Sequence, residues 1–449
     1  MDQKKINDWV KPGIYSGLQK ASIPLFGLLS TMLLAHKILS KSDMGVWVLF
    51  LVVTSFAELF RSGIVRTSLI KYLNFSQPGD QRMVLSAAFF LNAAITLILC
   101  FVLFFGSREI ALLLKAPELD PMLRIYVATL FVLIPFSHFE WFMYGKSMFK
   151  AILVIYVVRQ GSALVGMLIY FLIVGSASLS ALVFIYSAGI VLGLICGFYF
   201  VKQHLDLRFD LKKNWLLQLW NYGKFVFGSN VGTLIFRNAD QFMLSNITAN
   251  TSLVASQNIG TRIMNIADIP SQVIGDILFP KSSNPDLSGN ISRIKYFYEK
   301  AVGASLSFIL PFILMVVIFP KPLLFVLAGD KYYDAIPYLR LISITAIFLA
   351  FLKQWGVIID STGRPQVNFM ILMLLAALEV SFCFLFIPHY GLEGAAYSLV
   401  STHFLGFIIT QWLLNRYFKI SFVNCFKYAF QYYPTLYKLV KKKAFVKFK

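Results

Sequence analysis

Residues 83–106 read MVLSAAFFLNAAITLILCFVLFFG, a run without a single charged side chain. About 20 consecutive apolar residues are enough for one helix to cross the hydrocarbon core of a bilayer. The whole chain shares this character, because 58% of its 449 residues are hydrophobic and only 14% are charged. An ordinary soluble domain carries roughly 25% charged residues. The sequence therefore predicts an all-α integral membrane protein and argues against a soluble one.

Apolar segments of this kind recur along the chain and predict about twelve transmembrane helices. They lie at residues 18–39, 44–65, 83–106, 122–144, 151–174, 177–201, 219–247, 252–279, 297–320, 336–361, 366–388 and 392–416. The first six segments recur as the last six at a nearly constant offset in residue number. An even number of spans in each half keeps the two halves in the same orientation, as in transporters built from parallel repeats. We therefore expect two parallel six-helix lobes.

The repeat and the loops divide the chain into four parts. We expect an N-terminal six-helix lobe at 1–205, a cytoplasmic connecting loop at 206–218, a C-terminal six-helix lobe at 219–416 and a tail at 417–449. Lys and Arg are concentrated in alternate loops, and membrane proteins keep this excess on the cytoplasmic side. The bias predicts a multi-pass protein with both termini in the cytoplasm.

The C-terminal tail is basic and aromatic. From residue 418 it reads FKISFVNCFKYAFQYYPTLYKLVKKKAFVKFK, with eight Lys, many Phe and Tyr, and no acid. This mixture is typical of a helix that lies on an anionic membrane surface. We therefore expect anionic membrane lipids to be partners of the tail. The net charge of +20 then follows from the tail and the cytoplasmic loops, and we expect no binding of nucleic acid.

The sequence contains none of the common short motifs of enzymes and metal sites. The sequence has no GxSxG, Walker, HExxH or CxxC motif, and its four cysteines lie far apart. The loops outside the predicted membrane are too short to build a catalytic domain. We therefore expect no enzyme activity, no catalytic residue, no metal and no cofactor.

Ionisable residues inside the predicted spans point to function, because each is costly at the bilayer centre unless it faces protein or water. They are Glu58, Arg61, Arg66, Arg237, Asp240, Arg262, Asp268, Asp276, Lys353, Asp360 and Glu379. Guanidinium groups bind phosphate through paired, charge-assisted hydrogen bonds, so basic residues around a water-filled cavity would suit a phosphate-bearing ligand. The candidate substrate-binding residues are Arg61, Arg66, Arg237, Arg262 and Lys353. The acids that could carry a coupled proton or sodium ion are Glu58, Asp240, Asp268 and Asp276.

Structural interpretations of the same residues stay open. Arg237 and Asp240 share a helix face and could form an ion pair that holds two helices together. Arg61 and Arg66 lie near the predicted cytoplasmic end of their span, where long basic side chains can reach the interface. In the sixth span, Gly189, Gly193 and Gly197 follow each other at a spacing of four, which predicts close packing against another helix.

Four stretches of sequence resemble one family. They are LLAHKILSKSDMGVWVLF (33–50, with Ala35, Leu39, Ser40, Asp43 and Gly45), RNADQFMLSNITANTSLVASQNIGTRI (237–263), LFVLAGDKYYDAIPYLRLIS (324–343) and the stretch 363–401, which contains IPHYGLEGAA at 387–396. Together they resemble the bacterial polysaccharide and O-antigen flippases, which translocate lipid-linked oligosaccharides. These flippases belong to the multidrug, oligosaccharidyl-lipid and polysaccharide exporter superfamily. The chain departs from the family at Ser252–Gln257, where many members have a G-x-Y motif.

The resemblance implies two lobes around a central cavity and transport by alternating access. The implied substrate is an undecaprenyl-pyrophosphate-linked oligosaccharide, a repeat unit of O-antigen, capsule or exopolysaccharide. It would move from the cytoplasmic to the outer face of the bacterial plasma (inner) membrane, with glycan assembly proteins as further partners. The first alternative is a cation-coupled drug or metabolite antiporter of the same superfamily. A membrane glycosyltransferase or polymerase ranks lower, because no large loop is available for catalysis. A non-transporting scaffold for glycan assembly stays open, and it would be recognised by export that is indifferent to substitutions in the cavity.

Overall fold

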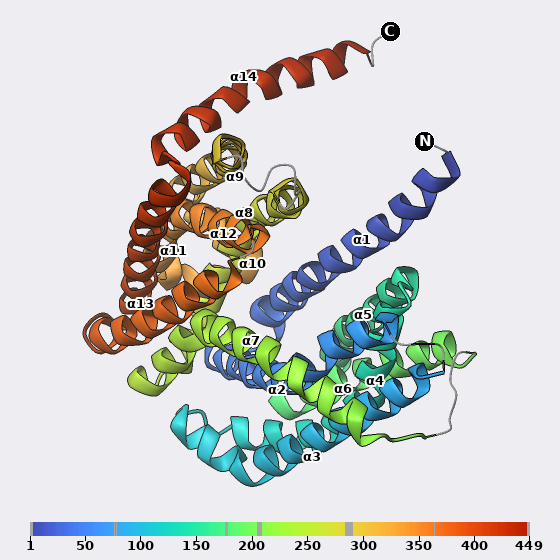
Figure 1. The fold of residues 1–449 in the computed structure, drawn as a ribbon. Coiled ribbons are helices and arrows are strands. Elements are labelled where there is room, and N and C mark those ends of the chain that lie inside the picture. The colour runs from blue at the N-terminus through green and yellow to red at the C-terminus, as the bar shows by residue number, and fades with distance from the viewer. Residues whose placement is uncertain are drawn as a thin grey trace. The chain divides into compact units, whose positions relative to one another are not determined.

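The computed structural model describes residues 3–75, 77, 79–175, 178–203, 209–282, 291–362 and 364–446, and these residues form helices and connecting turns without a β-strand (Figure 1). Eight of the described helices are long and apolar enough to cross a membrane. A ninth span results if the pair Asp330–Ser343 and Thr345–Ser361, bent by 46°, is counted as one. The expected all-α membrane architecture is therefore confirmed.

The chain divides into two compact units. Unit 1 comprises Met1–Leu234 and Ala249–Ala255, and unit 2 comprises Ile235–Thr248 and Ser256–Lys449. The helices up to the connecting segment are α1 (Gln3–Leu33), the short π-helix η1 (Leu34–Ile38), α2 (Lys41–Phe75), α3 (Gln81–Leu113), α4 (Leu119–Gly145), α5 (Phe149–Val174) and α6 (Leu179–Val201). The first predicted span covers the end of α1 and η1, and each of the other five N-terminal predicted spans falls on one of the helices α2 to α6. The predicted division into lobes at 206–218 stays a prediction.

The C-terminal helices are more irregular. They are α7 (Lys213–Thr248), α8 (Thr251–Ser282), α9 (Ile291–Ile318), α10 (Pro320–Ala328), the 3-10 helix η2 (Asp330–Ala335), α11 (Ile336–Ser343), α12 (Thr345–Ser361), α13 (Pro365–Phe418) and α14 (Phe422–Val446). Both α7 and α8 are long enough to span a membrane, but they carry the charges noted above. Helix α13 holds the eleventh and twelfth predicted spans, which meet at Gly391.

The IPHYGLEGAA motif marks the sharp break inside α13. Gly391 has φ 54° and ψ −121°, a conformation that residues with a Cβ rarely adopt. Pro388, three residues earlier, lacks the backbone N–H that would continue the helix. A Cβ at Gly394 would lie 2.4 Å from the carbonyl oxygen of Phe386, so the chain after the break returns close to the chain before it. The motif therefore provides the reversal between two spans.

The first motif has a similar structural explanation. Ser40 Oγ donates a hydrogen bond to Asp43 Oδ2 at 2.6 Å, and the Asp43 backbone N–H donates back to Ser40 Oγ at 3.1 Å, which caps the start of α2. A Cβ at Gly45 would lie only 1.8 Å from the carbonyl oxygen of Thr251. Within unit 1, Ser42 Oγ and Thr251 Oγ1 are also hydrogen-bonded at 2.8 Å. Glycine at position 45 thus allows the backbone at Thr251 to approach α2.

The glycine stripe of α6 packs against α5, as its spacing predicted. A Cβ at Gly189 would lie 2.5 Å from the carbonyl oxygen of Arg159, and one at Gly193 would lie 3.0 Å from Arg159 Cβ and 3.1 Å from Phe136 Cε2. The absence of side chains on this face lets α6 approach both α5 and α4. This packing fixes the position of Arg159, which belongs to a polar group around Arg61.

Candidate functional site

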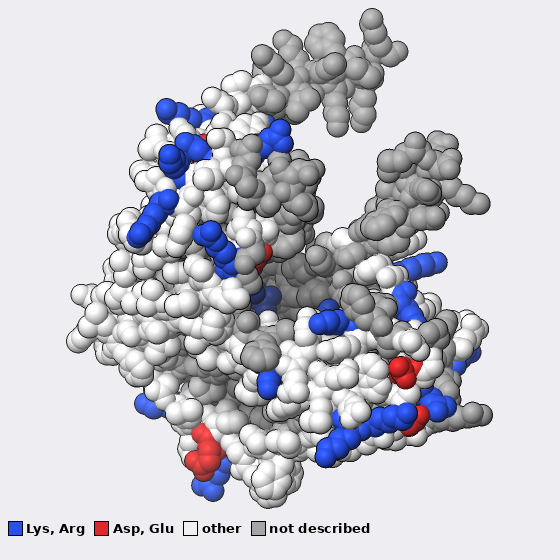
Figure 2. Space-filling model, in the orientation of Figure 1, with Lys and Arg blue, Asp and Glu red and all other residues white. Residues whose placement is uncertain are grey.

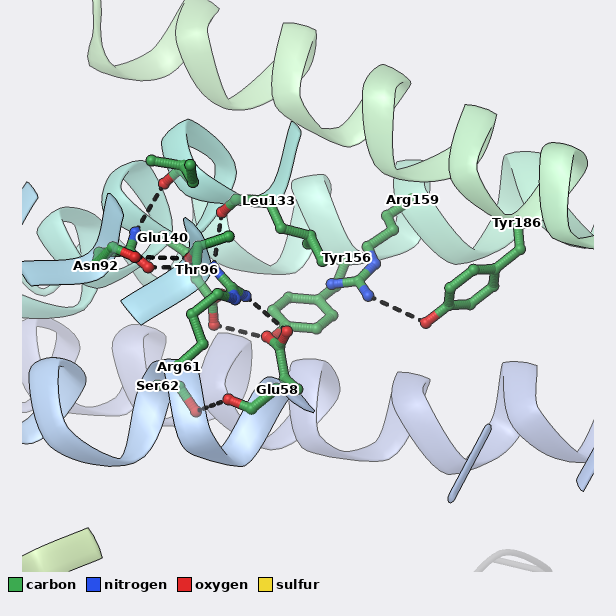
Figure 3. Close-up of polar contacts among 11 residues, drawn as sticks. Glu58, Arg61, Ser62, Asn92, Thr96, Leu133, Glu140, Tyr156, Arg159 and Tyr186 are labelled. Carbon is green, nitrogen blue, oxygen red and sulfur yellow. Dashed lines mark hydrogen bonds and ion pairs between the residues drawn. The ribbon is translucent and has the colours of Figure 1, made fainter. Parts of the chain in front are cut away.

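Arg61 lies at the centre of a polar group inside the helices of unit 1 (Figure 3). Its Nη2 donates to Glu58 Oε2 at 2.6 Å, and its Nη1 donates to the carbonyl oxygen of Leu133 at 2.8 Å. Asn92 lies beside this contact, with its Oδ1 3.5 Å from Nη1 and its Nδ2 donating to the carbonyl oxygen of Ile134 at 3.0 Å. The Arg61 side chain is 0% exposed, whereas Glu58 is 37% exposed. Arg61 therefore links α2 to α3 and α4.

Two further guanidinium groups, those of Arg159 and Arg66, make fewer hydrogen bonds than that of Arg61. Arg159 on α5 donates from Nη2 to Tyr186 Oη at 3.4 Å, and its Cζ lies 5.1 Å from the ring centroid of Phe136. Arg66 on α2 lies with its Cζ 4.6 Å from the ring centroid of Tyr144. Both side chains are partly exposed. In the described part of unit 1, neither has a carboxylate within ion-pair distance.

The charges of this polar group do not cancel. Glu58 interacts electrostatically with Arg61, Arg66 and Arg159. The second acid, Glu140 on α4, is buried and accepts a hydrogen bond at 2.8 Å from Tyr156 Oη. Three guanidinium groups thus accompany two carboxylates within membrane-spanning helices of unit 1, and Arg159 points from α5 toward the Glu58 and Arg61 side chains of α2 (Figure 3). The group has a net positive charge that could attract an anion.

Glu140, Arg159 and Asn92 were not among the site residues predicted from the sequence. A usable signal existed for the first two, because Glu140 lies in the predicted span 122–144 and Arg159 in the predicted span 151–174. An ionisable residue within an apolar segment is the same signal that identified Glu58 and Arg61. Asn92 carries no charge, and its role depends on the neighbouring carbonyl groups of α4, which hydropathy does not show.

In unit 2, Asp240 has a different partner from the one considered in the sequence. It is 5% exposed and accepts hydrogen bonds from Gln257 Nε2 at 2.6 Å and from the backbone N–H of Gln241 at 2.9 Å. Arg237, one turn earlier on α7, is exposed. Among the described residues, Asp240 is therefore bonded to an amide and forms no ion pair with Arg237.

A second buried carboxyl group and a buried amide oxygen lie near Asp240. Glu379 on α13 is 0% exposed and interacts electrostatically with Asp240. Its Oε1 accepts a hydrogen bond from the Cys383 thiol, with Sγ at 3.5 Å. Within the described chain, Glu379 Oε2 and Gln257 Oε1 are buried without a hydrogen-bond partner. Two carboxyl groups and an amide oxygen thus lie in one buried region of unit 2.

The remaining predicted residues lie elsewhere in unit 2. Lys353 on α12 donates to the buried carboxylate of Asp268 on α8, which also accepts from Gln272 Nε2 at 3.0 Å. Asp268 lines a cavity of about 120 Å³ together with Asn265 and His403. Arg262 Nε donates to Asn258 Oδ1 at 2.9 Å. The side chain of Asp276 is outside the described part of the structure.

Comparisons with known proteins give the family and the fold. Residues 33–337 match the family described as "Polysaccharide biosynthesis protein". An uncharacterized membrane protein of Methanocaldococcus jannaschii, MJ1068, is 28% identical over 239 residues, which are 52% of this chain and 47% of that protein. The chain thus matches about half the length of this curated relative.

Two solved structures share the fold over most of the chain. The lipid II flippase MurJ, in an inward closed conformation, has a TM-score of 0.74 at 12% identity and covers 96% of this chain and 93% of its own. An inward-facing multidrug resistance MATE family transporter of the MOP superfamily has a TM-score of 0.76 at 14% identity, with 89% and 98% covered. The expected resemblance is confirmed: the chain belongs to the polysaccharide biosynthesis protein family and shares its fold with MurJ and with this MATE family transporter.

Proposed function

We propose that the protein is a flippase for an undecaprenyl-pyrophosphate-linked oligosaccharide, a repeat unit of O-antigen, capsule or exopolysaccharide. The observation that carries this proposal is the net positive group in unit 1, in which neither Arg66 nor Arg159 has a carboxylate within ion-pair distance among the described residues. An anion that leaves water without such a partner costs several kcal/mol per charge. Guanidinium groups reduce this cost for a pyrophosphate by charge-assisted hydrogen bonds. The family assignment supports a glycan-related substrate.

The proposed transport is by alternating access from the cytoplasmic to the outer face of a bacterial plasma membrane, with both termini in the cytoplasm. The polar sugar-pyrophosphate head crosses the membrane in contact with polar side chains of the protein, and the lipid tail remains in the bilayer. An interior-negative potential favours outward movement of negative charge by about 2.3 kcal/mol per charge per 100 mV. A driving force therefore exists without hydrolysis of a nucleotide.

Deletion of the gene in its host tests the proposed function. We expect lipid-linked oligosaccharide to accumulate on the cytoplasmic face while surface glycan disappears, because synthesis continues and translocation stops. The measurement is the amount of lipid-linked oligosaccharide extracted from the membrane beside the amount of surface glycan, with the intact gene on a plasmid as the control. Normal surface glycan together with increased sensitivity to drugs would instead support the cation-coupled antiporter.

We also propose that Asp240 carries the coupled proton or sodium ion. Of the predicted acids, Asp268 is paired with Lys353 and Glu58 with Arg61, whereas Asp240 is bonded to the neutral Gln257 and lies near a second carboxyl group, Glu379. A bound proton or sodium ion would offset the cost of burying negative charge at these two carboxyl groups. A drug antiporter could use the same coupling residue, so this proposal does not by itself distinguish the two functions.

Asp240→Asn is expected to remove the effect of a cation gradient on transport. A tenfold gradient of a monovalent cation supplies about 1.4 kcal/mol, which supports up to about tenfold accumulation of substrate in a one-to-one exchange. The measurement is substrate accumulation in vesicles containing the protein, with sodium and proton gradients imposed separately. Asp120→Asn is the matched control, because Asp120 forms a partly exposed pair with Arg124. Unchanged gradient dependence in Asp240→Asn would refute the assignment.

A further inference from the structure

The first half of α14 is docked onto α9 around a buried carboxylate. Glu299 on α9 is 2% exposed, and its Oε1 accepts a hydrogen bond from the backbone N–H of Ser421 at 2.9 Å, just before α14 begins. Asn424 Nδ2 donates to both carboxylate oxygens, at 3.3 and 3.2 Å. A carboxylate at this place satisfies donors of the helix N-terminus and interacts favourably with its dipole. Glu299 therefore holds the start of α14 in place.

Close packing continues along the docked half. A Cβ at Gly303 would lie 2.6 Å from Tyr428 Cβ and 2.9 Å from the carbonyl oxygen of Cys425, so glycine allows α14 to approach α9. Tyr433 Oη donates to the carbonyl oxygen of Ser307 at 3.0 Å. Pro434 follows at once and removes a backbone donor from the helix. The docked half thus runs from Phe422 to Tyr433.

The surface formed by this docking is basic and aromatic. We define the basic surface by the exposed side chains of Arg293, Lys300, Arg416, Lys419 and Lys427. Figure 2 shows Lys and Arg gathered over α9, the end of α13 and the start of α14. Within residues 291–309 and 412–434 the single acid is Glu299, which is buried.

Large apolar and aromatic side chains are exposed beside these charges. Phe422 is 49% exposed, Phe430 is 62% exposed and Trp412 is 59% exposed. Arg416 lies with its Cζ 5.6 Å from the ring centroid of Trp412, and Lys300 Nζ lies 5.1 Å from that of Tyr296. Aromatic rings at the boundary of the hydrocarbon core, with basic groups among them, are typical of the interface between protein and lipid headgroups.

We propose that the basic surface binds the headgroups of anionic phospholipids, and that Glu299 makes this possible by docking α14. The phosphate groups of the bilayer supply the charge that the surface lacks, and Phe422 and Phe430 enter the adjoining apolar layer. The chain after Pro434 adds further Lys without any acid, so the same electrostatic preference extends beyond the docked half. This proposal concerns lipids of the bilayer and does not rest on the proposed transport substrate.

Lipid binding to the full chain tests the proposal directly. In native mass spectrometry of the detergent-solubilised protein, we expect phosphatidylglycerol to bind at least about tenfold more tightly than phosphatidylcholine. The triple variant Lys300→Gln, Lys419→Gln and Lys427→Gln is expected to lose most of this preference, since each Lys near the surface contributes about fivefold. The control variant Lys150→Gln, Lys202→Gln and Lys212→Gln changes the net charge equally, on exposed residues of unit 1, and is expected to keep the preference. Equal binding of both lipids to the wild type, or an equal loss in the control, would overturn the proposal.

Glu299→Ala separates the docked surface from simple electrostatics. Removal of a negative charge alone should strengthen the binding of phosphatidylglycerol. The structure leads us to expect the opposite, a loss of about tenfold preference, because α14 loses its anchor and the basic surface is no longer assembled. Glu299→Gln, which keeps one acceptor oxygen for Ser421 N–H, is expected to retain part of the preference. Unchanged or stronger phosphatidylglycerol binding by Glu299→Ala would refute the role of the docked helix.

Discussion

Replacement of Arg159 by Met is expected to reduce translocation of the lipid-linked oligosaccharide by about 100-fold or more, with normal insertion into the membrane. Met keeps much of the length with which Arg159 packs over Phe136 and against Gly193, but it removes the positive charge. A buried anion that loses its charged partner costs about 3–5 kcal/mol, which corresponds to at least two orders of magnitude in rate. The measurement is export of surface glycan in cells, normalised to the amount of protein in the membrane.

Two substitutions serve as controls for this expectation. Arg159→Lys keeps the charge but loses the planar, paired donors, so we expect intermediate export. Arg124→Met removes a guanidinium that is 49% exposed and paired with Asp120, and we expect wild-type export. If Arg159→Met exports glycan normally while Arg66→Ala does not, the anion site lies at Arg66 alone. Normal export by both variants would refute the proposed site in unit 1.

The positions of the spans could be predicted from sequence because a helix in lipid must be apolar over a fixed length and must satisfy its own backbone hydrogen bonds. The predicted segments 366–388 and 392–416 even locate the break in α13, since Gly391 lies between them. Hydropathy was less informative for 336–361, where the structure has two helices bent by 46°. A bend depends on the neighbours of a helix, and these are not encoded in its own average composition.

The partners of the charged residues were harder to predict than their existence. An ion pair of Asp240 with Arg237 was one interpretation of the sequence, yet the side-chain donor to Asp240 is Gln257, which lies on the next helix. Besides Glu58, Arg61 contacts a backbone carbonyl of α4 and Asn92 of α3, neither of which carries a charge. Such pairings depend on which helices become neighbours, so a single sequence without related sequences does not reveal them. Glu299 is a comparable case, because Ser421 N–H and Asn424 Nδ2 can donate to its carboxylate oxygens only when α14 is docked onto α9.

Unit 1 and unit 2 therefore differ in how they balance charge. In unit 1 the partly exposed Arg66 and Arg159 leave a net positive group suited to an anion. In unit 2 Lys353 and Asp268 form an ion pair, while the buried carboxyl groups of Asp240 and Glu379 have no basic residue within ion-pair distance among the described residues. A transporter that moves an anionic substrate and exchanges a cation requires both kinds of group. This distribution supports the proposed anion site in unit 1 and the proposed coupling residue Asp240 in unit 2. The predicted substrate-binding roles of Arg237, Arg262 and Lys353 stay predictions.

Arg61 allows a structural role to be distinguished from a role in substrate binding. Arg61→Ala is expected to lower the free energy of unfolding by about 3–5 kcal/mol, because it leaves Glu58, the Leu133 carbonyl and Asn92 without their donor. The measurement is the midpoint of thermal unfolding in detergent, together with the yield of folded protein. Arg66→Ala is the matched control on the same helix, and we expect a loss below about 1 kcal/mol, because the partly exposed Arg66 lies against the ring of Tyr144 and has no carboxylate within ion-pair distance among the described residues.

A double variant decides how the Arg61 result is interpreted. Replacement of both members of a buried ion pair by groups of similar size is often close to neutral, whereas removal of one member leaves an isolated charge. Glu58→Gln with Arg61→Met is therefore expected to recover more than half of the stability lost in Arg61→Ala. If the double variant is stable and still exports glycan, Arg61 serves the packing of α2 against α3 and α4. If it is stable but export stops, the pair acts on the substrate, and the predicted role of Arg61 as a ligand for the pyrophosphate gains direct support.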